Sequence, residues 1–390
     1  MAMDLPLAWL QLRAQKPQTL VAIASLTFIT VFLFMQVGSS SAFINALLEM
    51  PRKLKGDLFL LNASTVTALR PVPFSQRRLY QALSLAEVDS VTPLYMQGTQ
   101  IPDPSGKPGY LTRVLVIGFS ITTNPFHIQE IDDKLCKLGE RGVLLIDERS
   151  KSDFGPIIQE VIKLERSNIS LRSGLGQTKL SLKGVFPLGM NEVNYSHLLT
   201  SDATFMDIFR AKRKNINIGV IHLKPGADPG QAKKLLGNYL PSDVVVMQKH
   251  EMLAKEKELF EFKTPVGIFL RIAILVSIVG GIVVVYQILY QMTSKYLREY
   301  STLKAIGFSH RMLISIVLVQ AMTLTVTGYA LGLTISFYLY DWMSELISIP
   351  YRIEMSKAVA VFALVTFISQ VSALLAIRKL RELDPAELFG

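Results

Sequence analysis

Two glycine-containing segments of this 390-residue chain have some of the residues that hold a nucleotide phosphate. Gly174-Leu175-Gly176 lacks the third glycine and the βαβ context of a dinucleotide-binding loop. Gly106-Lys107 is followed by Pro108 and lacks the upstream glycine of a phosphate-binding loop. The five histidines are scattered without an H-E-x-x-H pattern, and no G-x-S-x-G turn presents a serine nucleophile. We therefore expect a non-catalytic chain without metal or cofactor, so that ATP and Mg²⁺ would be bound by a separate partner ATPase.

The net charge of +10 and the single cysteine restrict the remaining function classes. Cys136 alone allows neither an intrachain disulfide nor a cysteine-based zinc site, and we expect it to be a small buried hydrophobe. The basic residues of the central region are interleaved with acidic ones, and no nucleic-acid-binding motif is present. We therefore expect no nucleic acid partner, and instead a mildly basic surface that faces anionic membrane lipids.

The segment 295–312 has the residue pattern best suited to binding a partner protein. Apolar residues fall at helical spacing in and just after it, at Tyr300, Leu303, Ile306 and Leu313. The polar positions include Lys295, Arg298, Glu299 and Lys304. Gly307 would end the helix. This pattern predicts a short amphipathic helix, and the residues alone support an ordinary juxtamembrane helix and a partner-docking helix equally.

Four long apolar runs would hold this segment at a membrane, because a bilayer core requires about 20 apolar residues. The runs cover residues 19–37, 272–294, 312–340 and 358–377. Ser40-Ser41-Ala42 resembles a signal-peptide cleavage site, but the first run is longer than the apolar region of a signal peptide, so we expect an uncleaved span. The runs contain no Asp, Glu, Lys, Arg or His, which argues against an ion relay and therefore against a secondary transporter.

The positions of Lys and Arg in the short loops predict the orientation of the spans. One side carries Arg13, Lys16, Lys295, Arg298, Lys304, Arg311, Arg378, Lys379 and Arg381. The only short loop on the other side, 341–357, carries Arg352 and Lys357. We therefore expect a multi-pass protein of a bacterial inner membrane with both termini in the cytoplasm. The long segment 49–263 would then lie in the periplasm, because long domains translocate regardless of charge.

The segment 49–263 is long enough to bury a core of its own. Strand patterns occur at 57–61, 88–95, 111–119, 143–147, 169–171, 179–185, 216–223 and 244–247, and helical patterns at 75–83, 229–239 and 251–263. We expect a β-rich insertion at about 150–210. The predicted fold class is an α-helical membrane protein with four transmembrane helices and a large α+β extracytoplasmic domain between the first and second helices.

Three motifs resemble those of one permease family. Arg298-Glu299 followed by Leu303-Lys304-Ala305-Ile306-Gly307 is similar to the R-E-x-x-x-L-K-A-I/L-G segment of FtsX-like permeases. The tail 383–388 resembles their terminal D-P-A/I-E-A-L, and the start 7–13 resembles their L-A-W-x-N-L pattern. Together with one span before the domain and three after it, these motifs resemble the MacB/FtsX-like (type VII) family of ABC transporter permeases. The resemblance implies that the segment 295–311 is a coupling helix that contacts an ATPase dimer.

Further details are similar to the cyanobacterial DevC-type branch of this family. They are the variant E-Y-S-T-L-K-A-I-G at 299–307, the phrase Val116-Ile117-Gly118-Phe119 and the compact length without a fused ATPase. The resemblance implies a tripartite exporter with a DevA-like ATPase, a DevB-like periplasmic adaptor and a TolC-like outer-membrane channel. The permease would transmit ATP-driven motion to the periplasmic domain, and the implied cargo is glycolipid or another amphiphile.

The resulting map of the chain has eight parts. They are the N-terminal helix and first span (1–48), the periplasmic domain (49–263), the second span (264–294), the coupling helix (295–311), the third span (312–340), a short periplasmic loop (341–357), the fourth span (358–377) and a cytoplasmic tail (378–390). The alternative function is an FtsX-like, non-transporting signal transducer that controls a cell-envelope partner. The size of the outside domain favours the exporter, and copurification with an adaptor would distinguish the two.

Three groups of residues are expected to contact partners. The ATPase-coupling group is Arg298, Glu299, Leu303, Lys304, Ile306 and Gly307. Two nucleotide sites in an ABC dimer imply two permease copies, and small residues allow helices to pack closely in lipid, so we expect Ser277 and Gly281 at a homodimer interface with the first span. Gly328 and Gly332 are equally consistent with packing inside one copy. The expected adaptor-docking group, at a membrane-distal tip, is Phe186, Leu188 and Met190, although core positions are an alternative for each.

Overall fold

The computed structural model describes residues 4–104, 109–150, 152–173, 176–189, 196–210, 214–295, 310–347 and 351–381. The chain divides into two compact units. The helical unit consists of Met1–Ala42, Pro265–Glu345 and Pro350–Gly390. The α/β unit consists of Phe43–Thr264 and Leu346–Ile349.

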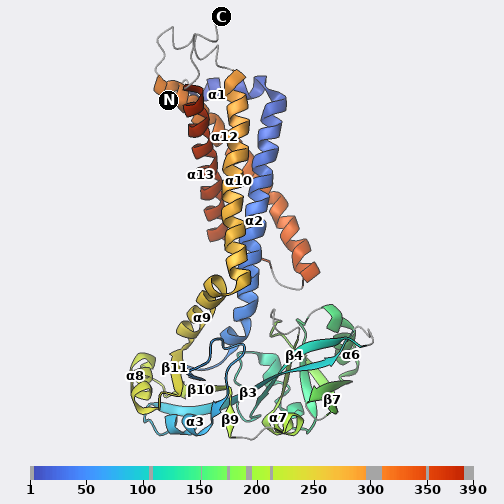
Figure 1. Ribbon diagram of the computed structural model, residues 1–390. Coiled ribbons are helices and arrows are strands. Elements are labelled where there is room, and N and C mark those ends of the chain that lie inside the picture. The colour runs from blue at the N-terminus through green and yellow to red at the C-terminus, as the bar shows by residue number, and fades with distance from the viewer. Residues whose placement is uncertain are drawn as a thin grey trace, which may run out of the picture. The chain divides into compact units, whose positions relative to one another are not determined.

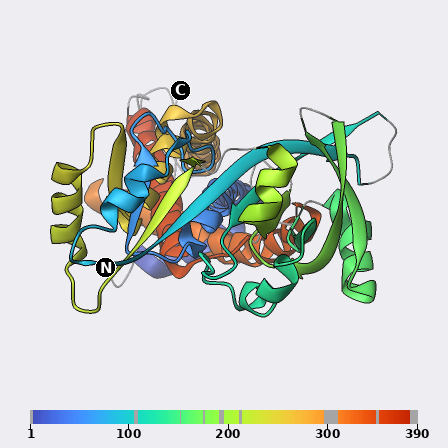
Figure 2. The same cartoon turned by 90° about the horizontal axis from the view of Figure 1, so that it is seen from below.

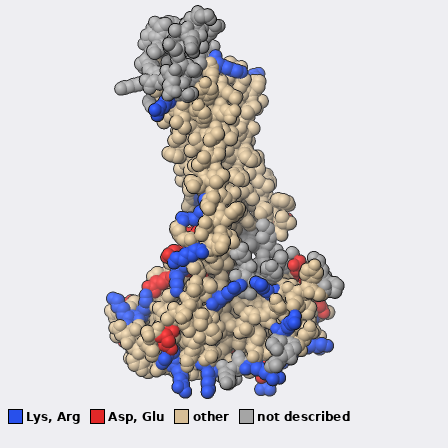
Figure 3. Space-filling model, in the orientation of Figure 1, with Lys and Arg blue, Asp and Glu red and all other residues tan. Residues whose placement is uncertain are grey.

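The helical unit contains the apolar helices of the chain (Figure 1). They are α1 (Asp4–Ala14), most of α2 (Lys16–Lys53), α10 (Pro265–Lys295), α12 (His310–Ile347) and α13 (Met355–Arg381). Among the described residues, four of these, α2, α10, α12 and α13, are long and apolar enough to cross a membrane. Figure 3 shows that the visible surface over the middle of these helices carries no Lys, Arg, Asp or Glu. The four predicted spans are therefore confirmed as helices.

Helix α2 continues well beyond its apolar run, which ends near residue 37. A serine inside a helix can bond its hydroxyl to the carbonyl one turn earlier, which slightly weakens the helix without ending it. The Ser41 hydroxyl does this and donates to the Val37 carbonyl oxygen at 2.8 Å. The helix formers that follow then carry α2 to Lys53.

The α/β unit is built on a nine-stranded sheet with the strand order β11-β1-β10-β3-β4-β8-β5-β7-β6, and a separate pair joins β2 and β9. The strands are β1 (Leu58–Asn62), β2 (Phe74–Ser75), β3 (Val88–Pro102), β4 (Leu111–Phe119), β5 (Val143–Asp147), β6 (Ser167–Ser173), β7 (Gly176–Phe186), β8 (Ser196–Ser201), β9 (Asn215–Ile216), β10 (Ile218–Leu223) and β11 (Val244–Gln248). The helices are α3 (Arg77–Ala82), α4 (Gln129–Asp132), α5 (Leu135–Leu138), α6 (Gly155–Leu164), α7 (Asp202–Phe209), α8 (Pro229–Tyr239) and α9 (Lys249–Glu258). A 3₁₀ turn (Ser152–Phe154) precedes α6, and a π-helical turn (Leu259–Lys263) follows α9.

Strand β3 is the longest strand and belongs to both halves of the sheet. Its first half pairs with β10 up to Leu94, and its whole second half pairs with β4. The last strand in the order, β6, returns to β3 through the pair Gln100 and Arg172. A closed ring therefore forms within the sheet, and its strands are, in order, β3, β4, β8, β5, β7 and β6. In Figure 2, α8 and α6 lie at opposite ends of the unit, beyond the two ends of β3.

Alternate residues of the central strands enter two different cores. On β4, Val114 and Val116 belong to one buried cluster, whereas Leu115 and Ile117 belong to another. Because side chains alternate between the faces of a strand, the sheet is covered on both faces here. This explains why β4 reads in the sequence as a nearly continuous apolar run.

The expected β-rich insertion at 150–210 is not a separate subdomain. Its strands β6, β7 and β8 belong to the same sheet as β3 and β4, and β8 pairs with β4 in parallel. The stretch also contains the helices α6 and α7. The α+β fold expected for residues 49–263 is confirmed, with the stretch 150–210 as a continuation of its sheet.

Candidate functional site

The predicted coupling segment connects two helices of the helical unit. Helix α10 ends at Lys295, and α12 begins at His310. The six expected ATPase-coupling residues, Arg298, Glu299, Leu303, Lys304, Ile306 and Gly307, lie outside the described residues. Their docking role stays a prediction.

The glycines of the third span pack within one copy of the chain. A Cβ atom on Gly332 would lie 2.6 Å from Cβ of Thr30, and one on Gly328 would lie 2.7 Å from Cβ of Leu26. Both distances are shorter than real carbon contacts, so α12 approaches α2 as closely as only glycine allows. Of the two possibilities for Gly328 and Gly332, the structure supports packing inside the protomer.

Ser277 and Gly281 of the second span lie at the bottom of an apolar groove between α2 and α10, with a volume of about 520 Å³. Ser277 is 8% exposed, and its hydroxyl donates to the Ala273 carbonyl oxygen. A Cβ atom on Gly281 would lie 3.4 Å from Ile29. Large apolar side chains at the groove, such as Phe28, are exposed in the single chain. The homodimer interface expected at these positions stays a prediction.

The expected adaptor-docking residues are not exposed anchors. Phe186 and Leu188 are fully buried in one of the two sheet cores, and Met190 lies outside the described residues. The loop after β7 also lies against the end of α2, where the ammonium group of Lys53 donates to the carbonyl oxygen of Pro187. The expectation was wrong because an apolar Phe-Pro-Leu sequence looks the same in a core loop and in a docking loop.

A buried carboxylate holds this loop in place. Asp147 at the end of β5 accepts hydrogen bonds from the backbone N–H groups of Arg149 (3.0 Å), Leu188 (3.1 Å) and Gly189 (2.7 Å). Its Oδ2 also lies 3.2 Å from Nδ1 of His197 on β8, and both side chains are fully buried. Sequence reasoning missed this pair because 50 residues separate its members. The signal was an aspartate that directly follows a wholly apolar strand.

A second buried carboxylate, Glu256 on α9, is 2% exposed. It accepts hydrogen bonds from the backbone N–H of Ala68 at 2.6 Å and from the hydroxyl of Thr67 at 2.7 Å. Burial raises the pKa of this carboxyl above its ordinary value, although both hydrogen bonds act in the opposite direction. The contact fastens the segment before the second span to the loop that follows β1.

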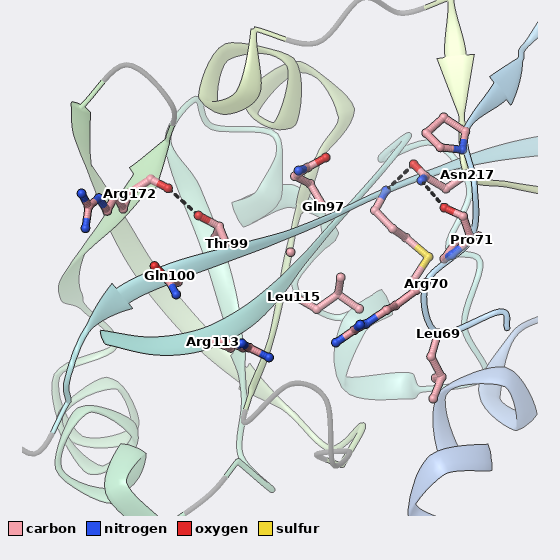
Figure 4. Close-up of a pocket in the computed structure, with 13 residues that line it drawn as sticks. Leu69, Arg70, Pro71, Gln97, Thr99, Gln100, Arg113, Leu115, Arg172 and Asn217 are labelled. Atoms are coloured by element: carbon pink, nitrogen blue, oxygen red, sulfur yellow. Dashed lines mark hydrogen bonds between the residues drawn. The ribbon is translucent and has the colours of Figure 1, made fainter. Parts of the chain in front are cut away.

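An open pocket of the α/β unit, with a volume of about 700 Å³, lies on the second half of β3 (Figure 4). Strand β10 covers this edge of β3 only as far as Leu94, and Asn217 then accepts a hydrogen bond from the backbone N–H of Met96 at 2.8 Å. Beyond that point the pocket begins. Its wall includes Arg70 from the segment after β1, Arg113 from β4 and Arg172 from β6.

The floor of this pocket is apolar and has no side chain at its centre. Gly98 pairs with Leu115 across the two strands, and Gln100 pairs with Arg113 two residues further on. A Cβ atom on Gly98 would meet nothing within 4 Å. The buried Leu115 side chain is therefore the floor beneath open space, with Arg113 beside it.

Among the described residues, no group of three His, Cys, Asp or Glu is placed to hold a metal ion. Cys136 is exposed, so the expectation of a buried cysteine was wrong. It lies on the one-turn helix α5, whose only buried side chain is Leu138. A helix of one turn leaves most of its residues facing solvent.

Two solved structures resemble parts of this chain. One is the periplasmic region of MacB from Actinobacillus actinomycetemcomitans, at 11% identity and a TM-score of 0.33, covering 53% of this chain and 95% of that chain. The other is the extracellular domain of the ABC-type transporter YknZ from Gram-positive bacteria, at 12% identity and a TM-score of 0.31, covering 50% of this chain and 99% of that chain. No curated protein matched.

The sequence of the last three spans matches a known family. Residues 271–385 match the family described as FtsX-like permease C-terminal. The match begins in α10, contains α12 and ends beyond α13, so it includes the segment between α10 and α12. This part of the chain is therefore similar in sequence to the C-terminal domain of FtsX-like permeases.

Proposed function

We propose that this protein is the permease subunit of an ABC-type exporter and that a separate ATPase chain drives it. The observation that carries the proposal is the FtsX-like match at residues 271–385, which includes the amphipathic segment between α10 and α12. Permeases of this kind work with ABC-type ATPase partners. The sequence of the segment supplies two apolar anchors, Leu303 and Ile306, with charged residues beside them.

The proposed mechanism is transmission of motion rather than passage of cargo through the helices. ATP-driven closure of the partner would move the segment 295–311, and α10 and α2 would carry that motion to the α/β unit. The absence of ionisable residues from the four apolar runs supports this, because a coupled ion pathway needs such residues. Both termini would lie in the cytoplasm and the α/β unit in the periplasm, as the distribution of Lys and Arg indicates.

An ABC ATPase dimer has two nucleotide sites, so the permease would act as a homodimer. The groove between α2 and α10 supports this proposal, because it combines small residues with exposed phenylalanines. A second copy could place a helix there and bury those aromatic rings. Lipid would fill the groove in a single copy.

The remaining partners rest on the DevC-type resemblance alone. We propose a DevA-like ATPase, a DevB-like periplasmic adaptor and a TolC-like outer-membrane channel, with glycolipid or another amphiphile as cargo. Membrane lipids would surround the four spans. The adaptor would bind the α/β unit at a surface other than Phe186 and Leu188, because those two side chains are in the core.

The test is association of the tagged permease with its ATPase in detergent. Leu303→Asp should remove the ATPase from the pull-down, since loss of one buried apolar anchor costs about 2 kcal/mol or more at an interface. Ser301→Asp is the matched control, because it adds the same charge to the same segment at a position off the apolar stripe. Unchanged association of the Leu303→Asp variant would refute the docking role.

A further inference from the structure

We propose that the pocket on the second half of β3 binds a phosphate group between the guanidinium groups of Arg70 and Arg113. The ligand would be a small molecule or the head group of an amphiphile. The proposal rests on the α/β unit by itself and does not depend on the ATPase.

The charge of the pocket is the first argument. Arg70, Arg113 and Arg172 line it, and its described lining contains no Asp or Glu. Within the part of the chain that the structure describes, none of the three forms an ion pair. Other arginines of the same unit do have carboxylate partners: Arg78 pairs with Asp243, Arg141 with Asp207 and Arg149 with Glu49. The positive charge of this pocket is therefore left for an external anion.

The direction of the side chains is the second argument. In Figure 4, Arg70 and Arg113 extend toward one another from the segment after β1 and from β4. The Arg172 guanidinium points away from them, while its backbone carbonyl oxygen accepts a hydrogen bond from Thr99 at 2.5 Å. An anion between two converging guanidinium groups would offset the repulsion between them. A guanidinium group presents a planar fork of donors that fits phosphate and carboxylate oxygens.

The residues at the floor of the pocket indicate which other chemical groups the ligand has beside its phosphate. Gly98 leaves open space above the buried Leu115, directly beside Arg113. Gln100, on the same face of β3 as Gly98, is exposed and can hydrogen-bond a polar ligand. An apolar floor with a few converging polar groups is the usual construction of a small-molecule site. A volume of about 700 Å³ accommodates more than a bare inorganic ion.

The experiment uses the full-length protein in nanodiscs of zwitterionic lipid and isothermal titration calorimetry. The probes are inorganic phosphate, dihexanoyl phosphatidic acid, dihexanoyl phosphatidylcholine and hexaglutamate. Arg70→Gln/Arg113→Gln removes the charges, whereas Gly98→Leu fills the space above Leu115 and keeps both charges. Arg141→Gln is the matched control, because Arg141 is an exposed arginine of the same unit that already has a partner.

We expect wild-type protein and Arg141→Gln to bind phosphatidic acid but not phosphatidylcholine. The double variant should bind at least tenfold more weakly, and so should Gly98→Leu. Phosphatidic acid binding at least tenfold tighter than inorganic phosphate would identify an amphiphile head group, and similar affinities would identify a free anion. The proposal is overturned if neither phosphate probe binds, if both pocket variants bind like wild type, or if only hexaglutamate binds.

Discussion

The carboxylate of Glu256 accepts a hydrogen bond from the backbone N–H of Ala68 at 2.6 Å, although 188 residues separate the two and the glutamate is almost fully buried. Burial is the largest influence on this group, and it raises the pKa of the Glu256 carboxyl above 4.5. The fold therefore holds this proton more tightly than the unfolded chain does. The resulting stability is fully present below pH 4.5 and is lost as the pH rises through the folded pKa.

Glu256→Gln should remove the loss of folding stability that occurs as the pH rises. At pH 8 the variant should have a higher melting midpoint than wild type, and the difference should shrink toward pH 4.5. Glu256→Ala should instead lower the midpoint at every pH, because the buried N–H of Ala68 loses its acceptor, which costs about 1–3 kcal/mol. Thermal unfolding of the full chain in detergent between pH 4.5 and pH 8 measures both. A glutamine variant that follows the wild-type pH curve would contradict the assignment.

The close approach of α12 to α2 predicts a sharp difference between two glycines. Gly332→Ala should destabilise the helical unit, because its Cβ atom would lie 2.6 Å from Cβ of Thr30 and 3.1 Å from the backbone oxygen of Thr27. Gly280→Ala is the control, since a Cβ atom there meets nothing within 4 Å. Both changes raise helix propensity by about 1 kcal/mol, so any difference between them reports packing. Equal detergent-unfolding midpoints for the two variants would show that the approach is looser than described.

The proposed homodimer predicts crosslinks at the groove between α2 and α10. Ser277→Cys or Gly280→Cys, in a Cys136→Ser background, should form disulfide-linked dimers in native membranes under mild oxidation. Tyr338→Cys, a 75% exposed position on α12, should remain monomeric. A disulfide requires Cα atoms within about 7 Å, so the crosslink reports close contact and not mere proximity. Dimers at position 338 but not at 277 or 280 would move the interface to α12.

The Asp147 contacts predict that this carboxylate stabilises the loop after β7. Asp147→Asn replaces one acceptor oxygen with a donor, which leaves either the backbone N–H of Gly189 or those of Arg149 and Leu188 without their acceptor. The expected cost is about 1–3 kcal/mol in the free energy of unfolding. Asp207→Asn is the control, because that aspartate is exposed and lies 3.8 Å from Arg141. The urea unfolding midpoint should fall for Asp147→Asn and stay unchanged for Asp207→Asn. Limited proteolysis of Asp147→Asn should cut near residue 188 first.

The sequence was most informative where a segment has one clear period and clear ends. Helix α8 occupies the predicted residues 229–239 because Pro229 opens it and the Asp228 side chain caps it through the N–H groups of Gly230 and Gln231. Strands β4 and β5 also have their predicted bounds, since their apolar runs are buried on both faces. Long apolar runs made the four membrane helices equally clear.

Strand β8 was missed because its sequence, S-H-L-L-T-S, has polar residues at both ends. All six residues are nevertheless buried, and hydrogen bonds satisfy the polar ones: the Thr200 hydroxyl, for example, donates to the Val143 carbonyl oxygen at 2.8 Å. Such partners come from distant parts of the chain, so local pattern could not reveal them. The arginine pocket was missed for the same reason, because Arg70, Arg113 and Arg172 come from distant parts of the chain.

The strand order has a consequence for how the protein is made. Strand β1 lies between β10 and β11, so the first strand of the α/β unit pairs only with strands that follow it by about 160 residues or more. A ribosome must therefore synthesise nearly the whole unit before β1 can join the sheet. Until then its edges are open to incorrect partners, and such long-range pairing is slow to form. Truncating nascent chains before residue 244 should leave β1 sensitive to protease, whereas chains that include β11 should protect it.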